Sequence, residues 1–280
     1  MPFVTRFAPS PTGRLHLGHA FSALLAHDAA RAAGGRFLLR IEDIDSVRCR
    51  EEHVAALLED LDWLGIAYER PVRRQSEHMA DYAAALDRLG RMGVLYPCIC
   101  TRREIALEVA RAPSAPHGPE GALYPGTCRR RSRRAIEAAI AAGRPYALRL
   151  DVARANEVLD GAPLRFEDDG HGSVIARPED LGDVVLGRKD FPASYHLAVV
   201  HDDALQGITH VIRGADLFHA THVHRLLQAL LGLPVPHYRH HRLLADASGR
   251  RLAKRDGAET LAALRARGMT SADIRRQLGL

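Results

Sequence analysis

Residues 7–19, "FAPSPTGRLHLGH", decide the fold. Two prolines, two glycines and two histidines follow a short apolar run within these thirteen residues. Proline removes a backbone donor and glycine weakens helical order, so the composition suits neither a core helix nor a strand interior. These residues therefore serve a purpose other than packing in the core.

The flanking segments predict a strand, helix, strand unit. "FVTRFA" (3–8) is typical of a short strand, residues 16–33 of a helix closed by Gly34 and Gly35, and "RFLLRIED" (36–43) of a strand buried on both faces. Such a unit predicts a parallel crossover. A phosphate-bearing ligand is expected at the carboxyl end of the first strand, where the helix N-terminus points.

Further along, apolar residues at helical spacing predict core helices over 50–64 and 77–92. The pattern loosens from 95 to 180, with a Pro/Gly-rich loop (112–126), a helix near 132–142 and a strand over 146–150, which predicts an inserted subdomain. Three strand-like runs, "VVLG", "HLAVVHDD" and "ITHVIRG", then lead to a helix over 217–232. A loop (246–258) precedes two short helices, the last opening with Thr270 and Asp273 in capping-box spacing.

We therefore expect four parts. Residues 1–94 form the first half of the main domain, 95–182 an inserted subdomain, 183–245 the second half of the main domain, and 246–280 a basic loop with the C-terminal helices.

Composition indicates an ordinary globular chain. Of its 280 residues, 46% are hydrophobic and 26% charged, which argues against disorder. The net charge of +5 and the arginine clusters at 128–134 and 248–255 fit a polyanionic partner, although solvated faces explain the clusters equally well. No apolar run approaches the roughly 20 residues of a spanning helix, and the start lacks a signal-peptide pattern. We expect a cytoplasmic protein.

Two separated motifs carry a family resemblance. The tetrapeptide at 16–19, His-Leu-Gly-His, is weak by itself, since structural histidines explain it equally well. It opens a helix after a strand, however, and is matched downstream by "RLAKR" (251–255). Together they resemble the HIGH and KMSKS signatures of class I aminoacyl-tRNA synthetases, and "RFAPSPTG", "RIED" and "VIRGADL" narrow the resemblance to the glutamyl group. This implies an α/β fold, a Rossmann-like nucleotide-binding domain with an inserted zinc-containing α/β subdomain and a short helical C-terminal segment.

The implied reaction begins when the amino acid's carboxylate attacks the α-phosphorus of ATP and releases pyrophosphate. This chemistry needs charge and alignment more than a general base. By resemblance, His16, His19 and Lys254 are catalytic and, with Gly18, bind ATP, which arrives with Mg²⁺. Ala253 stands where the family usually has serine, so we expect a less ordered loop with the activity retained.

Selecting glutamate needs a cation for its side-chain carboxylate and an anion for its ammonium group. By resemblance, Arg6, Tyr195 and Arg213 face the γ-carboxylate, while Ser10 and Glu42 face the α-amino group. The predicted glutamate site comprises Arg6, Phe7, Ala8, Pro9, Ser10, Glu42, Tyr195 and Arg213. Alternatively, Glu42 and Asp43 merely pair with Arg40 or cap a turn.

Cysteine spacing indicates a metal site. Cys98 and Cys100 form a C-x-C pair, and Cys128 follows, which in a cytoplasmic protein favours zinc over a disulfide. Three cysteines leave one tetrahedral position. The segment resembles the glutamyl-queuosine subgroup, which completes the site with a tyrosine, here Tyr124. A water ligand, His117 as ligand, or three unrelated buried cysteines are the alternatives. One structural Zn²⁺ is expected, with Cys49 an ordinary thiol.

Because only 25 residues follow Arg255, we expect no helical anticodon-binding domain of the kind that longer glutamyl relatives carry. This again resembles the glutamyl-queuosine subgroup, which esterifies glutamate to the queuosine base at the wobble position of tRNA(Asp). The implied partner is that anticodon stem-loop, with arginines on its phosphates; we expect a monomer. The rival interpretations are a minimal synthetase charging the 3′ end of tRNA(Glu), a catalytically silent binding protein that keeps the fold, and a zinc-stabilised RNA-binding module.

Overall fold

The computed structural model describes residues 2–111, 117–118, 121–188, 193–244 and 259–280. Its first three strands, β1 (Val4–Phe7), β2 (Arg36–Ile41) and β3 (Glu69–Arg74), form a parallel sheet in the order β1-β2-β3. The helix α1 (Leu17–Ala32) connects β1 to β2 and packs on β1. The predicted strand, helix, strand unit is therefore confirmed.

A second set of strands continues beyond β1. β11 (His210–Gly214) pairs in parallel with β12 (His237–His241), β12 meets β8 (Arg165–Asp168) in parallel, and β9 (Gly172–Ile175) folds back antiparallel to β8. At the start of β11, the Thr209 backbone N–H donates to the Val4 carbonyl at 2.9 Å, so β11 lies beside β1. The strand order reverses at this junction, and ligands of doubly wound sheets bind at such a switch point.

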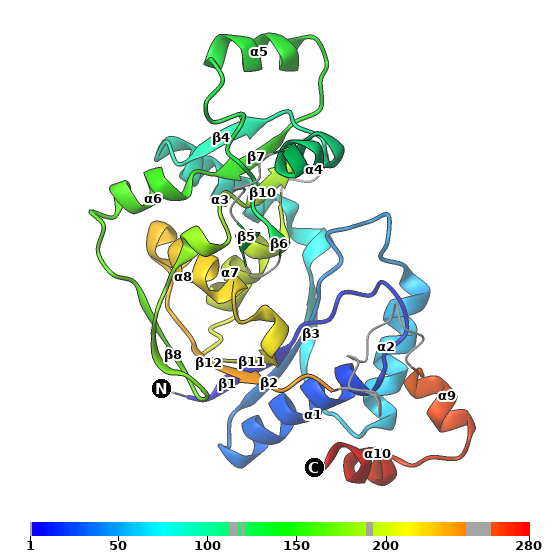
Figure 1. Cartoon of the computed structure of the whole chain (residues 1–280). Coiled ribbons are helices and arrows are strands. Elements are labelled where there is room, and N and C mark those ends of the chain that lie inside the picture. The colour runs from blue at the N-terminus through cyan, green and yellow to red at the C-terminus, as the bar shows by residue number, and fades with distance from the viewer. Residues whose placement is uncertain (1, 112–116, 119–120, 189–192, 245–258) are drawn as a thin grey trace.

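Two groups of helices pack into separate apolar cores (Figure 1). In the first, α1 and β2 share a core with α2 (Glu51–Trp63), α9 (Leu261–Ala266) and α10 (Ser271–Leu278). In the second, α3 (Met79–Arg91), α7 (Tyr195–Leu205) and α8 (Ala220–Leu231) pack together. The C-terminal helix α10 thus packs beside α1, the helix whose N-terminus lies at the predicted phosphate site.

A third sheet lies at the opposite end of the molecule from α10 (Figure 1). It is antiparallel and contains β4 (Leu95–Cys98), β7 (Ala147–Leu150) and β10 (Val185–Arg188). The same region holds α4 (Arg102–Arg111), α5 (Arg133–Ala141), α6 (Val152–Val158) and the short pair β5 (His117–Gly118) and β6 (Gly121–Ala122). The "VVLG" run thus joins the antiparallel sheet through β10 and not the parallel strands. The four-part division of the chain stays a prediction.

One predicted strand is wrong. "HLAVVHDD" (196–203) lies within the helix α7, whose residues from Leu197 to Val200 are all buried. A short run buried on every side has no strand or helix period, so its pattern could not distinguish the two. The helix predicted over 77–92 begins at Met79, after a 3₁₀ turn.

At the C-terminal end, the capping box predicted at Thr270 and Asp273 is confirmed. Among the described helices, none is both long and apolar enough to cross a membrane.

Candidate active site

A cleft of about 690 Å³ opens where β1 and β11 end and α1 begins. Every residue that we predicted for the glutamate and ATP sites lines this cleft, within the described part of the chain: Arg6, Phe7, Ala8, Pro9, Ser10, His16, Gly18, His19, Glu42, Tyr195 and Arg213. Lys254 and Ala253 lie outside the described residues. The structure thus brings together segments more than 200 residues apart, while the role of each residue stays a prediction.

The two histidines of the tetrapeptide cap α1. The Gly18 N–H donates to Nδ1 of His16 at 3.1 Å, and the His16 N–H donates to Nδ1 of His19 at 3.3 Å. A nitrogen that accepts a hydrogen bond carries no proton, so each ring carries its proton on Nε2. A Cβ on residue 18 would lie 2.9 Å from the His16 ring, which explains the glycine. The cap therefore sets two imidazole N–H donors at the positive end of a helix, an arrangement suited to anions.

Beneath the cleft, buried arginines and carboxylates balance one another. Nε of Arg6 donates to Asp203 at 2.9 Å, and the fully buried Arg40 donates to Asp203 at 2.8 Å and to Glu42 at 3.1 Å. Next to them, Arg73 donates to Asp202 at 2.9 Å. Burial raises the pKa of Glu42, and Arg40 and Arg6 act against that rise. Each of these charges has a partner of opposite sign, as a buried ion cluster requires.

The alternative reading of Glu42 and Asp43 is correct for Asp43 and partly so for Glu42. Asp43 accepts hydrogen bonds from Nε of Arg74 at 3.1 Å and from the Ser76 N–H and hydroxyl, so it holds a turn after β3. Glu42 pairs with Arg40 but also lines the cleft. Of the two carboxylates, only that of Glu42 therefore lines the cleft.

Arg213, at the end of β11, contrasts with this cluster. Only 6% of it is exposed, and it donates to the Tyr195 hydroxyl at 3.1 Å, to Thr221 Oγ1 at 2.7 Å and to His240 Nε2 at 3.2 Å. All of these partners are neutral, and no described carboxylate lies within 4.0 Å of its guanidinium. Burial raises the pKa of Tyr195, which keeps that phenol protonated. The wall of the cleft thus carries a buried positive charge that the described residues leave uncompensated.

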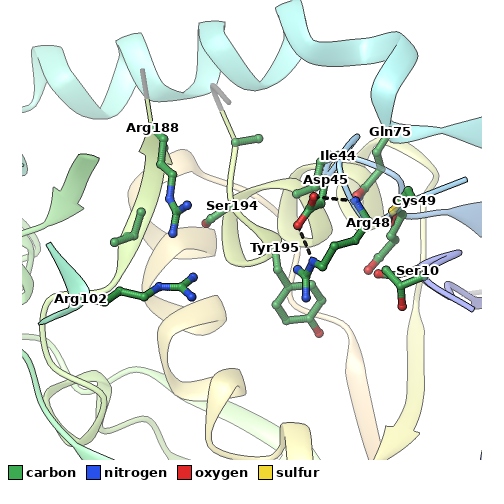
Figure 2. A pocket seen from close by; sticks show the side chains of 15 residues that line it. Ser10, Ile44, Asp45, Arg48, Cys49, Gln75, Arg102, Arg188, Ser194 and Tyr195 are labelled. Atoms are coloured by element: carbon green, nitrogen blue, oxygen red, sulfur yellow. Dashed lines mark hydrogen bonds and ion pairs between the residues drawn. The ribbon is translucent and has the colours of Figure 1, made fainter. Parts of the chain in front are cut away.

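A second cavity, of about 310 Å³, adjoins the first and shares Ser10, Thr12, Glu42 and Tyr195 with it. Figure 2 shows Arg102 and Arg188 reaching into it from the side of the antiparallel sheet, opposite Ser10 and Cys49. Arg48, beside Cys49, pairs with Asp45 at 2.6 Å, whereas Arg102 and Arg188 form no ion pair with the described residues. The second cavity therefore offers two unpaired arginines to an anionic group that binds next to the first cleft.

The cysteine cluster lies at the end of β4. The sulfur atoms of Cys98, Cys100 and Cys128 all lie within 4.8 Å of one another. The Tyr124 hydroxyl lies 3.3 Å from Sγ of Cys98 and 3.7 Å from Sγ of Cys100, and accepts the Cys128 N–H at 2.8 Å. Thiolates that bind one zinc ion tetrahedrally at about 2.3 Å lie about 3.8 Å apart, a separation comparable with that of these sulfur atoms, so this donor set could hold a metal ion. The His117 side chain is outside the described part of the structure, and Cys49 is not in the group.

Sequence reasoning missed the residues that support these side chains, notably Asp203, Thr221 and His240. Asp203 ends the run that we interpreted as a strand, and His240 lies in "HYRHH", which has no apolar alternation. The one sequence signal for these residues was that polar residues cluster directly next to apolar runs. A search for apolar periodicity does not detect such clusters.

Comparisons with known proteins agree with this geometry. The family described as "tRNA synthetases class I (E and Q), catalytic domain" matches residues 2–279. The chain belongs to this family of class I tRNA synthetases.

Among individual proteins, it is 54% identical to the glutamyl-Q tRNA(Asp) synthetase of Rhodobacter capsulatus, over 99% of this chain and 100% of that protein. It is 46% identical to the glutamyl-Q tRNA(Asp) synthetase of Nocardia farcinica, over 92% of this chain and 77% of that protein. The glutamate-tRNA synthetase structure from Elizabethkingia anophelis superposes with a TM-score of 0.75 and 28% identity, covering 92% of this chain. The chain spans 53% of that longer synthetase.

Proposed function

We propose that the protein activates L-glutamate with ATP and Mg²⁺ and transfers the glutamyl group to the queuosine base at the wobble position of tRNA(Asp). The observation that carries the amino-acid part is the uncompensated charge of Arg213 in a cleft that also exposes Glu42. The names of the similar proteins from R. capsulatus and N. farcinica support the acceptor.

The cleft matches glutamate by charge. Glutamate carries two carboxylates and one ammonium group, so it brings one net negative charge, which would offset the buried charge that the described residues leave uncompensated at Arg213. Its side-chain carboxylate would take a hydrogen bond from Arg213 and from the Tyr195 hydroxyl, and its ammonium group would meet Glu42. Glutamine lacks that negative charge and would leave Arg213 unpaired, which costs far more than one missing contact.

In the first step, an oxygen of the α-carboxylate attacks the α-phosphorus of ATP, a new O–P bond forms, and pyrophosphate leaves with its bonding electrons. Negative charge on the phosphates would meet the Nε2–H donors of His16 and His19 at the positive end of α1, together with Lys254. No proton leaves the carboxylate, so positioning and electrostatic stabilisation suffice.

In the second step, a hydroxyl of the acceptor nucleoside attacks the activated acyl carbon, AMP leaves, and the hydroxyl proton is lost to solvent or phosphate. The acceptor must reach the site beside the bound glutamate. The second cavity adjoins that site at Ser10, Glu42 and Tyr195, and its Arg102 and Arg188 suit the phosphates of a nucleic acid.

We also propose that Cys98, Cys100, Tyr124 and Cys128 bind one structural Zn²⁺. The ion would join the end of β4 to the segment 124–128, so the neighbouring loops would keep one arrangement. Elemental analysis is expected to find one zinc per chain, reduced to a trace in Cys128→Ser; full occupancy in the variant would contradict the ligand set.

The cytoplasmic location and the monomeric state of the protein stay predictions.

The proposal is tested by offering labelled glutamate and ATP with three RNAs: queuosine-containing tRNA(Asp), the same tRNA without the modification, and tRNA(Glu). Label on the modified tRNA(Asp) alone is the expected result. Label at the 3′ end of tRNA(Glu) would instead identify a minimal translational synthetase. No label, with no glutamate-dependent exchange between pyrophosphate and ATP, would favour a binding protein. Arg213→Gln is the matched control and is expected to incorporate far less label at the same glutamate concentration.

A further inference from the structure

Arg213 has acceptors on every side of its guanidinium. Besides Tyr195 and Thr221, two histidines approach it: His240, whose Nε2 lies 3.2 Å from Nε of Arg213, and His224, whose Nδ1 lies 3.4 Å from both terminal nitrogens. An arginine has donors only, so the nitrogen that each histidine aims at it must be unprotonated. In both histidines, the ring nitrogen that faces the arginine therefore carries a lone pair and no proton.

The tautomer of His240 is set by a carboxylate on another strand. Nδ1 of His240 lies 2.6 Å from Oδ2 of Asp168, at the end of β8, and neither side chain is exposed. Nδ1 consequently carries the proton and donates it to Asp168, which leaves the lone pair of Nε2 for Arg213. Burial and Arg213 lower the pKa of His240 to about 4, in agreement with a neutral ring. The two hydrogen bonds thus point the same way: Arg213 donates to His240, and His240 donates to Asp168.

His224 is oriented in a parallel way. Since its Nδ1 faces the arginine, its proton lies on Nε2, 3.2 Å from Nδ1 of His196. Burial and the charge of Arg213 lower the pKa of both rings, to about 4 for His196. This second series of hydrogen bonds ends at the neutral ring of His196. Among the described residues, Asp168 is therefore the carboxylate linked to Arg213 by these hydrogen bonds, with the imidazole of His240 between them.

We propose that Asp168 and His240 are positioning residues that orient Arg213 toward the side-chain carboxylate of the substrate. Through Arg213 they set the preference for a carboxylate over an amide. This inference rests on the proposed function for the identity of the substrate, but the tautomer of His240 does not.

The spacing explains why the carboxylate stands one ring away. Arg6 shows the alternative: its guanidinium contacts Asp203 directly at 2.9 Å, so that charge is already matched. A carboxylate in direct contact with Arg213 would compete with the substrate in the same way. The imidazole passes on orientation, because its acceptor nitrogen fixes the guanidinium plane, while the positive charge stays available for the ligand.

The kinetic test compares Asp168→Asn, His240→Leu and His240→Gln in glutamate-dependent exchange between pyrophosphate and ATP. His240→Leu is expected to raise the KM for glutamate by about thirtyfold, the worth of one buried hydrogen bond to a charged group. Its kcat and its KM for ATP should stay within about twofold, because only binding of the side-chain carboxylate is weakened. Glutamine is expected to compete poorly with glutamate in the wild type and better in the variant, because the variant holds Arg213 less firmly toward a carboxylate.

His240→Gln and one further variant, His171→Gln, separate positioning from folding. His240→Gln keeps an acceptor for Arg213 and is expected to recover most of the lost affinity. His171→Gln is the matched control, since His171 contacts the other carboxylate oxygen of Asp168, Oδ1, at 2.6 Å, is half exposed, and has no hydrogen bond to Arg213 among those of the described residues. The control should keep wild-type constants. If His240→Leu fails to fold, Asp168→Asn carries the same prediction with an isosteric change.

The tautomer of His240 is measured without any ligand, by long-range ¹H–¹⁵N correlation spectra of histidine-labelled protein. A proton on Nδ1 with a bare Nε2 supports the proposal. A proton on Nε2, or equal losses of affinity for glutamate and ATP in the variants, would overturn it. A wild-type protein without glutamate-dependent exchange would contradict the proposed function instead, and the spectrum would still decide how Arg213 is held.

Discussion

Arg40 and Arg213 are both buried arginines close to the same cleft, yet their surroundings differ. Arg40 is fully buried and contacts Asp203 and Glu42, with Asp202 at 3.9 Å. Arg213 contacts a tyrosine, a threonine and histidines. A buried charge that already has its counter-ions is required by the fold, because its removal leaves those counter-ions buried and unpaired, whereas a charge held by neutral acceptors is available to a ligand. The predictions below test this distinction, from the largest expected free-energy change to the smallest.

Replacing Arg40 should damage the fold itself. Arg40→Met leaves buried carboxylates without their common partner, and the free energy of unfolding is expected to fall by about 3–5 kcal/mol. Urea unfolding followed by circular dichroism measures the change. An unfolding curve that overlays the wild type would contradict the structural role of Arg40.

Replacing Arg213 should damage binding and spare the fold. Arg213→Gln is expected to weaken glutamate binding by about a hundredfold or more, roughly 3 kcal/mol, because a buried substrate carboxylate loses its cation. Calorimetric titration with glutamate measures this loss. The urea midpoint should change little, since no described carboxylate loses a partner, and a collapse as large as that of Arg40→Met would erase the contrast between the two arginines.

Asp60 tests the same rule with the opposite sign of charge. It lies on α2, is 1% exposed, and neither carboxylate oxygen has a hydrogen-bond partner among the described residues. Burial raises its pKa to about 6, against the pull of Arg265 and Arg14. A raised pKa means that the folded chain binds the proton more tightly than the unfolded chain. The stability from Asp60 is therefore present below about pH 4 and is lost as the pH rises through about 6.

The loss amounts to about 2–3 kcal/mol between pH 4 and pH 8. Asp60→Asn should remove it, so the difference in unfolding free energy between wild type and variant should grow in favour of the variant over this pH range. Thermal melts at half-unit pH steps follow the difference, and parallel profiles for the two proteins would refute the assignment.

An exposed pair gives the lower bound. Arg36 and Glu69 join β2 to β3 at 2.6 Å with about half of each side chain in solvent. Water and salt screen such a pair, so Glu69→Gln is expected to change the unfolding free energy by less than about 1 kcal/mol. A loss comparable to that of Arg40→Met would show that ion pairing on this sheet matters irrespective of burial.

Part of this molecule could be predicted from its sequence. The β1-α1-β2 unit and the residues lining the cleft followed from local pattern and from motif resemblance, since glycine, proline and apolar periodicity act over a few residues. The helix α7 could not be predicted, because its four-residue apolar run is followed by His201 and by two aspartates that are also buried, Asp202 and Asp203. The arginines that pair with these aspartates lie more than 120 residues earlier. The strand β12 was missed because four of its five residues are polar, and His240 is buried there through contacts with Arg213 and Asp168, which lie on other strands and leave no local sequence pattern.

The histidine cap of α1 bears on how this protein can change. At many functional sites a residue serves the ligand at the expense of the fold, so removing it stabilises the protein. His16 and His19 differ, because the rings that face the cleft also accept the first backbone N–H groups of the helix. Their loss would fray the helix along with the site. Activity and stability are thus coupled with the same sign at this position, and a lineage that abandoned the chemistry would gain nothing in stability by discarding these histidines.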